Sequence, residues 1–369
     1  MARDLGMCSG KGKRMDGGDN HAMDDGRVAQ GIGFQAEHCL HHGAPLTASV
    51  VRAMLPLMSG TTAVGRRIAA WPGLPLEDAM PLRFAGGLHH LHLTQREPRL
   101  APLYAGAMPH QDAVDALIGA VTADHDAALL PWFDGPPQTN EAGRSASLMA
   151  GLLWLAQRLG PTFEISELGA SAGINTMMER YHYDLGGIEV GPTDSPMRIR
   201  PVWRGSPPPA GAIRITEIAG CDIAPVDLAD PAAALRVKAY VWPDAPERLA
   251  RMDAAIALAA QQPPTLTATD AADWTAARLT RPQASGVTRV IQHSIMWQYL
   301  GDHRRAAITA MIEAAGAAAT AEHPLAWIML ETNRATFQHE LTIRYWPGGG
   351  APVVLGHAHA HGAWVEWLG

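Results

Sequence analysis

The spacing of apolar residues divides the chain into two parts with different periods. Over residues 26–160 apolar residues recur every three or four positions, as in PLTASVVRAMLPLM and RSASLMAGLLWLAQRLG, and Pro and Gly clusters interrupt them. This period is that of amphipathic helices. The sequence therefore predicts an N-terminal all-α region over residues 26–160.

After residue 160 short β-rich runs alternate with helical segments. Strands are predicted at residues 163–168, 212–218, 264–269, 287–294, 325–331, 341–346 and 352–358. Helices are predicted at residues 172–182, 244–262 and 302–316. Alternation of this kind specifies a sheet covered by helices on both faces. The last two strands are joined by a glycine turn, which predicts an antiparallel hairpin at the end of a mostly parallel sheet. We therefore expect residues 161–369 to form one α/β domain.

Two further segments are set apart by composition. Residues 1–25 are rich in Gly, Asp and Lys and have nothing to bury, which predicts a flexible extension outside the fold. Residues 183–211 contain YDLGGIEVGPTDSP and GSPPPAG, and such loop-rich text predicts an insertion into the α/β domain.

Composition and charge narrow the class of protein. The net charge of -7 comes without any concentrated basic patch, so nucleic acid is not an expected partner. No apolar run is long enough to span a membrane, and residues 1–25 lack the apolar core of a signal peptide. Three widely separated cysteines argue against a disulfide framework and fit a reducing compartment. We expect a cytoplasmic protein with a small-molecule partner; the sequence leaves the oligomeric state open.

The segment FEISELGASAGIN fits two unrelated devices. A glycine-rich turn after a strand can let a cofactor approach bare main chain. The cofactor-binding residues predicted on this interpretation are Glu167, Gly169, Ala170, Ser171, Gly173 and Asn175. Alternatively, G-x-S-x-G is a nucleophile elbow, with Ser171 attacking a carbonyl and His359 or His361 as base. An elbow needs several strands before it, whereas this chain is predicted to be helical up to residue 160, so the cofactor turn is favoured.

Later strand ends supply further candidates. Asp222 follows the second long strand, where a carboxylate can accept hydrogen bonds from both ribose hydroxyls. Asp270 and Ala271 follow the third, where they can bind adenine, although Asp270 is equally well placed to cap a helix. His293 and Ser294 end the fourth strand, at the edge where open α/β sheets bind ligands.

Several long motifs, taken together, resemble one bacterial family, that of domain of unknown function 2332. They are ELGASAGIN, GCDIAPVD, KAYVWPDAPERLARMDAAIALA, TDAADW, HSIMWQYL, HAHGAWVEWL and PPQTNEAGRSA, and the resemblance extends from about Phe34 to Leu368. The family resembles S-adenosylmethionine-dependent methyltransferases in its core. This implies a Rossmann-like sheet and S-adenosylmethionine as cofactor. Ser171 stands where such turns often have a third glycine, and no Asn/Asp-Pro-Pro-aromatic signature follows the fourth strand, so nucleobase amines are poor substrate candidates.

Candidate substrate-binding residues gather at one predicted helix start and after the fourth strand. They are Asn140, Glu141, Arg144 and Trp297. Glu141 and Arg144 are three residues apart, so they can also form only an ion pair within a helix. His293 or Glu141 is the expected base for a protonated methyl acceptor. Two alternatives stay open: a nucleotide-binding module without chemistry, and a serine hydrolase.

Histidines cluster in three places and raise the question of a metal. His357, His359 and His361 alternate as if along one strand face. The second group is His38, His41 and His42, in which His38 and His42 are one helical turn apart. The third group is His89, His90 and His92, and neither helical group has a companion H-E-x-x-H pattern. Polar histidines at the edge of the core explain all three groups, so no metal is expected.

Overall fold

The computed structural model describes residues 19–369, with side chains from residue 26 onward. These residues form two compact units, each described by itself below. The helical unit runs to Pro137 and also contains Trp242–Asp244, and the α/β unit consists of Gln138–Val241 and Ala245–Gly369. Residues 1–18 of the predicted extension lie outside the described residues. Residues 19–25 are helical, because the first described helix begins at Asp19, so the prediction of a flexible segment does not hold for them.

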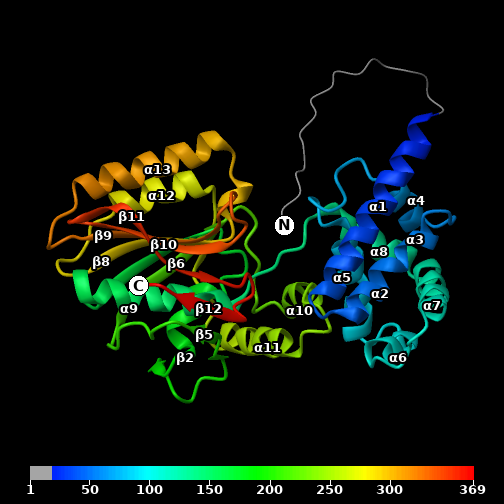
Figure 1. Ribbon diagram of the computed structural model, residues 1–369, viewed down its shortest axis with the longest axis horizontal. Coiled ribbons are helices and arrows are strands. Elements are labelled where there is room, and N and C mark those ends of the chain that lie inside the picture. The colour runs from blue at the N-terminus through cyan, green and yellow to red at the C-terminus, as the bar shows by residue number, and fades with distance from the viewer. Residues whose placement is uncertain (1–18) are drawn as a thin grey trace. The chain divides into compact units, whose positions relative to one another are not determined.

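The helical unit packs short helices around an apolar core (Figure 1). Its helices are α1 (Asp19–His41), α2 (Pro45–Arg52), α3 (Met54–Leu57), α4 (Ala63–Ala69), α5 (Met80–Leu93), α6 (Ala101–Tyr104), α7 (Gln111–Asp124) and α8 (Asp126–Leu129), with 3-10 turns at Pro98–Leu100 and Leu130–Asp134. Core positions such as Val28, Ile32 and Ala36 in α1 follow the predicted helical spacing and are fully buried. None of the described helices is long and apolar enough to cross a membrane.

The N-terminus of α2 is capped by a residue distant in sequence. The carboxylate of Asp244 accepts hydrogen bonds from the backbone N–H of Leu46 at 2.8 Å and of Thr47 at 2.9 Å, and from the Thr47 hydroxyl at 2.6 Å. These are N–H groups that the first turn of a helix leaves unpaired. The segment Trp242–Asp244 is thereby held in the helical unit.

The α/β unit is built on a nine-stranded, mostly parallel sheet. Its strands in chain order are β1 (Thr162–Leu168), β5 (Val202–Arg204), β6 (Arg214–Asp222), β7 (Leu266–Ala268), β8 (Thr288–Ser294), β9 (Leu325–Thr332), β10 (His339–Trp346), β11 (Gly349–Ala358) and β12 (Trp364–Trp367). They lie in the order β5-β12-β11-β10-β9-β8-β1-β6-β7. The strands from β7 to β9 are parallel, and β10 pairs antiparallel with both β9 and β11. The predicted α/β class and antiparallel hairpin are confirmed.

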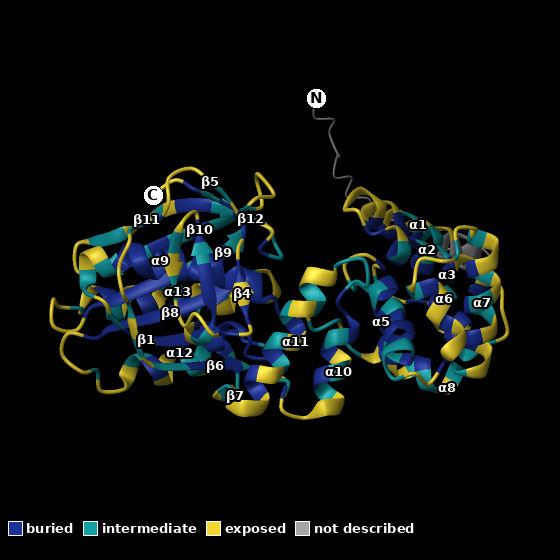
Figure 2. Cartoon of the chain, turned by 90° about the horizontal axis from the view of Figure 1, so that it is seen from below, coloured by how far each residue is buried: buried dark blue, intermediate teal, exposed yellow. Residues whose placement is uncertain are grey.

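Helices cover both faces of this sheet. On one face lie α9 (Ser145–Leu159), α10 (Pro231–Ala239) and α11 (Pro246–Gln261), and on the other α12 (Ala271–Thr280) and α13 (Asp302–Ala317). An apolar core lies on each face of the sheet, and alternate residues of a strand pack into one core or the other. Val290 packs toward α9, whereas Ile291 packs toward α13. In Figure 2 the central strands are buried, whereas one side of α10 and of α11 is exposed.

Three features differ from the sequence prediction or refine it. Helix α9 packs on β9 and β10, so the boundary between the two units lies near Pro137, whereas the sequence predicted it at residue 160. The predicted helix at 172–182 is wrong: the segment contains a 3-10 helix, Asn175–Arg180, followed by a strand. The predicted insertion at 183–211 largely coincides with a small sheet of β2 (His182–Leu185), β3 (Ile188–Val190) and β4 (Arg198–Ile199), together with β5 at the sheet edge.

Candidate functional site

The carboxyl ends of β1, β6 and β8 form the edge at which the sequence placed its candidates. Strand β1 lies between β6 and β8. Strands β6 and β7 lie on one side of it and β8 and β9 on the other, so the order of the strands reverses at β1. Ligands of open α/β sheets bind in the crevice at such a switch point. The turn that follows β1 is therefore in the expected position for a ligand site.

This turn adopts left-handed backbone conformations that favour glycine. The φ angles are 66° at Gly169, 52° at Ser171 and 71° at Gly173. A Cβ at Gly169 would lie 2.9 Å from the side chain of Met296, and one at Gly173 would lie 2.8 Å from Pro264. The side-chain faces of both glycines are thus filled by the protein itself.

Neighbouring segments hold the turn in place. The backbone N–H of Ala170 donates to the Cys221 carbonyl at 2.9 Å, and that of Ser171 donates to Asp222 Oδ2 at 2.9 Å. The N–H of Ile174 donates to Asn140 Oδ1 at 2.8 Å. Asn140, predicted to bind substrate, is therefore a buried support of the turn. The 3-10 helix after the turn is too short to present the dipole of an α-helix, so that part of the cofactor argument is lost.

A group of buried polar side chains lies under the turn on the α9 face, and we call it the inner cluster: Arg144, Glu167, Asn175 and Gln292. Glu167 and Gln292 are opposite each other on β1 and β8. Among the described residues, Glu167 Oε2, both amide atoms of Asn175 and the amide oxygen of Gln292 have no hydrogen-bond partner. Buried polar groups in native proteins are usually paired, so this concentration marks a place where a polar ligand can bind.

The electrostatics of the inner cluster centre on Glu167. Burial raises the pKa of Glu167 to about 8, an effect that Asn175, Arg144 and Gln292 partly offset. The Arg144 guanidinium donates through Nε to the Ala360 carbonyl at 2.9 Å and through Nη1 to the Ser294 carbonyl at 3.3 Å. Its Nη2 has no hydrogen-bond partner among the described residues. The cluster thus places a carboxyl group, that of Glu167, and a guanidinium with an unused N–H group, that of Arg144, together in the protein interior.

His293 lies on the opposite face of the sheet from Glu167. Its Nδ1 is 2.7 Å from Glu331 Oε1, and its Nε2 accepts from the Trp327 indole at 3.0 Å. Trp297 stacks on its ring at 4.7 Å between centroids. Because both ring nitrogens are engaged, the geometry argues against His293 as a base and makes it a support for the loop after β8. Trp297 is half-buried in this stack, away from the inner cluster's strand face.

The residues predicted to hold ribose and adenine already have protein partners. Asp222 accepts from the backbone N–H of Ser171 and of Ala224, both at 2.9 Å. Asp270 caps α12 by accepting from the Ala272 N–H and pairs with Arg304 at 3.0 Å. Ala271, the first residue of α12, packs into the apolar core. The backbone carbonyl of Ser294 accepts a hydrogen bond from Arg144. Carboxylate oxygens can accept more than one hydrogen bond, so the roles in ribose and adenine binding stay predictions.

Ser171 has one feature of a nucleophile and lacks another. Its positive φ is what a strained elbow shows. Its Oγ is buried, however, and has no hydrogen-bond partner among the described residues. A serine nucleophile requires an adjacent base, so the structure gives no support to the hydrolase alternative.

The histidine groups are not gathered into a recognisable metal site. Strand β11 ends at Ala358, so His359 and His361 lie in the following turn and do not continue the alternation of His357. Within the described part of the chain no three His, Cys, Asp or Glu side chains are arranged to hold a metal ion. The expectation of no metal stays a prediction.

Beside the inner cluster lies a second charged group, which we call the arginine cluster: Glu141, Arg248, Arg251 and His361. Arg248 Nε donates to Glu141 Oε1 at 2.9 Å, and His361 Nδ1 is 3.7 Å from the same oxygen. The predicted ion pair of Glu141 with Arg144 is replaced by this one with Arg248. Close backbone approach brings His361 here, because a Cβ at Gly143 would lie 2.6 Å from the His361 carbonyl oxygen.

Sequence reasoning missed Arg248, Arg251 and Gln292. The two arginines are three residues apart at the start of an amphipathic helix, so they share a face, which was a usable signal. Gln292 is a polar residue in a strand whose every residue is buried. A polar residue in a buried strand is unusual, and this could have identified it as a candidate site residue.

Comparison with known proteins adds the family. A family model described as an uncharacterized protein conserved in bacteria (DUF2332) matches residues 29–367. The chain belongs to this family. The DUF2332 match spans both units and includes the inner cluster and the arginine cluster. No curated protein and no solved structure matches the chain. The DUF2332 description names no reaction, so methyl transfer is a proposal.

Proposed function

We propose that the chain binds S-adenosylmethionine at the carboxyl end of β1 and transfers its methyl group to a small molecule. The observation that carries this proposal is the inner cluster, in which one oxygen of a buried carboxyl, the Asn175 amide and the Gln292 amide oxygen have no partner among the described residues and lie beside a glycine turn at the switch point of the sheet. A ligand that supplied the missing partners would account for groups that are costly to leave unpaired.

The chemistry of the cluster fits the amino-acid end of this cofactor. An α-amino acid group carries an ammonium and a carboxylate on neighbouring atoms. Glu167 is the acceptor available to the ammonium, and the Arg144 guanidinium has N–H groups left for the carboxylate. Asn175 and Gln292 offer both donors and acceptors to the same group.

Catalysis would depend mainly on position. The bound cofactor would supply an activated methyl group, and the residues of the chain would align the acceptor and exclude water. Glu141 is buried, is held by Arg248 and adjoins a surface hollow, so it is the base that we propose for an acceptor that arrives protonated. A module that binds the nucleotide without chemistry would share the binding step and lack turnover.

Calorimetry with S-adenosylhomocysteine tests the binding step. We expect heat and a rise in melting temperature, because a ligand at a hundredfold excess over its dissociation constant stabilises the folded state by about 2.7 kcal/mol. Glu167→Gln should weaken binding by about tenfold to a hundredfold, since Glu167 would ionise when it receives the ammonium, whereas glutamine cannot, and a hydrogen bond between charged groups is worth roughly 1.5–3 kcal/mol. Glu322→Gln, an exposed carboxyl before β9, is the matched control and should bind as the wild type does.

Two results would overturn the proposal. No heat and no thermal shift at millimolar ligand would exclude the cofactor. Unchanged binding by Glu167→Gln would remove the inner cluster from the cofactor site. Binding without turnover on a panel of metabolites would favour the module without chemistry.

A further inference from the structure

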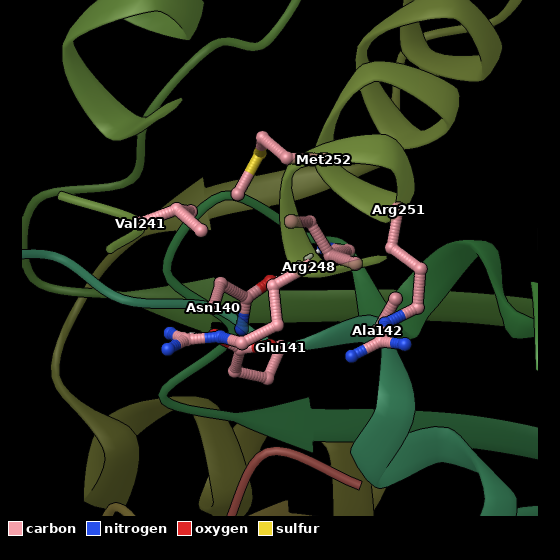
Figure 3. A pocket seen from close by; sticks show the side chains of 8 residues that line it. Asn140, Glu141, Ala142, Val241, Arg248, Arg251 and Met252 are labelled. Atoms are coloured by element: carbon pink, nitrogen blue, oxygen red, sulfur yellow. Dashed lines mark hydrogen bonds and ion pairs between the residues drawn. The ribbon is translucent and has the colours of Figure 1, made fainter. Parts of the chain in front are cut away.

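The arginine cluster surrounds a hollow next to the N-terminal turns of α11. The hollow is partly open to solvent and narrow: the space in it that a water molecule could occupy is about 10 Å³, room for roughly one oxygen atom. Its lining includes Asn140, Glu141, Arg248 and Arg251. Figure 3 shows both arginine side chains leaving α11 and reaching toward Glu141 and Ala142.

The two arginines differ in their partners. Arg248 is neutralised by Glu141, and both side chains are largely buried, at 11% and 6% exposed. Arg251 forms no ion pair among the described residues. Its Nε is buried without a partner, and its Nη2 reaches only the His361 carbonyl, at 3.4 Å. A charged group with unpaired N–H donors is costly to bury, so the hollow lacks an acceptor.

The negative charges near Arg251 compensate it only in part, because Glu141 is already paired with Arg248 and Glu247 is exposed to solvent. Burial, together with Arg248 and Arg144, lowers the pKa of His361 to about 2, so this imidazole is neutral at pH 7. Glu331 is engaged by His293 on the other face of the sheet. Three guanidinium groups, those of Arg144, Arg248 and Arg251, therefore lie around Glu141, and of these only Arg248 forms an ion pair with it. The N-terminal end of α11, a helix of 16 residues, adds a further positive partial charge.

Geometry narrows the ligand to a small planar anion. A guanidinium presents two parallel N–H groups that match the two oxygens of a carboxylate. The hollow is too narrow for a bulky head group, and the neighbouring Glu141 carboxylate disfavours a dianion such as phosphate. We infer that Arg251 binds a carboxylate group of the small-molecule substrate, so that the methyl acceptor is a carboxylic acid. That the carboxylic acid is a methyl acceptor rests on the proposed function, whereas the binding of a carboxylate at Arg251 does not.

Sodium acetate, added without S-adenosylmethionine, tests the carboxylate site. At equal ionic strength, acetate should raise the melting temperature of the wild type above its value in sodium chloride. Arg251→Gln should reduce the apparent affinity for acetate by at least about tenfold, because a charge-assisted hydrogen bond is lost. Arg200→Gln, an exposed arginine on the same unit, is the control and should respond as the wild type does.

A second measurement uses only the wild-type protein, in case Arg251→Gln does not fold. Phenylglyoxal modifies accessible arginines, and peptide mass spectrometry reads each site. Acetate should slow modification of Arg251 and leave Arg200 unchanged. Equal modification of Arg251 in acetate and chloride would overturn the inference, as would equal melting temperatures in the two salts. Stronger stabilisation by phosphate than by acetate would overturn the choice of a carboxylate.

The two proposals fail separately. Binding of S-adenosylhomocysteine without any effect of acetate would remove the carboxylate site and keep the cofactor. An acetate effect that depends on Arg251, without binding of S-adenosylhomocysteine, would keep the carboxylate site and remove the methyl acceptor from it.

Discussion

Glu167→Gln replaces a buried carboxyl with a neutral amide of nearly the same shape, and it should change how stability depends on pH. Burial raises the pKa of Glu167 from its ordinary value of 4.5 to about 8 in the folded protein. Between these values the folded protein keeps a proton that the unfolded chain releases. The stabilisation is complete below about pH 4.5 and is lost as the pH rises through about 8.

The size of this effect follows from the two pKa values. One pKa unit corresponds to about 1.36 kcal/mol, so the wild type should lose about 4 kcal/mol of unfolding free energy at this site between pH 5 and pH 9. Glu167→Gln has no proton to lose there. Its stability should therefore gain about 4 kcal/mol relative to the wild type over the same interval.

Urea denaturation followed by tryptophan fluorescence at pH 5, 7 and 9 measures the difference. Most of the tryptophans lie in the α/β unit, so the signal reports mainly on the unit that contains Glu167. Other titrating groups are common to both proteins and cancel in the comparison. Glu322→Gln should follow the wild type. Identical pH dependence of Glu167→Gln and the wild type would show that Glu167 is ionised in the folded protein, which would refute the account of the inner cluster.

Four further outcomes test other parts of the structure. Asp222→Ala should cost about 2 kcal/mol, measured by urea denaturation, because two backbone N–H groups lose a charged acceptor. Ser171→Gly should be at least as stable as the wild type, whereas Ser171→Val should lose about 1–2 kcal/mol in thermal unfolding, since φ is 52° there. Asp244→Ala should cost about 1–2 kcal/mol in the unfolding of the helical unit, because α2 loses its cap. The lowered pKa of His361 means that the unfolded chain takes up a proton below about pH 6.5 and the folded one does not, so stability should fall from pH 7 to pH 5 in the wild type and fall less in His361→Gln.

The fold was largely predictable because hydrophobic period is a local property of the sequence. The predicted long strands are all present, and the antiparallel hairpin formed by β10 and β11 follows from its glycine turn. The predicted helix at residues 172–182 failed for a reason that lies in tertiary structure. Tyr181 and Tyr183 are both fully buried, and their hydroxyls bond to the carbonyls of Ile174 and Met178, which fixes a 3-10 turn and a strand in place of a longer helix.

The site was less predictable, because side-chain direction at a sheet edge depends on the strand register. His293 and Gln292 are adjacent in sequence and both end up buried, yet they point to opposite faces of β8. The sequence placed His293 in the site because it ends the fourth strand, whereas the register places Gln292 beside Glu167.

Tertiary structure also explains why the sequence identified Glu141 as a candidate site residue but did not identify the arginine that pairs with it. Glu141 and Arg144 stand close together in sequence, so an ion pair between them was one alternative to substrate binding, but closeness in sequence does not decide which cation is nearest. Arg248 reaches Glu141 across 107 residues, and Arg144 turns instead to the carbonyls of Ser294 and Ala360. This exchange leaves the Nη2 group of Arg144 without a hydrogen bond and Arg251 without an ion pair among the described residues. The unpaired N–H donors of Arg144 and Arg251, on which both proposals depend, therefore arise from long-range pairing, which a single sequence does not reveal.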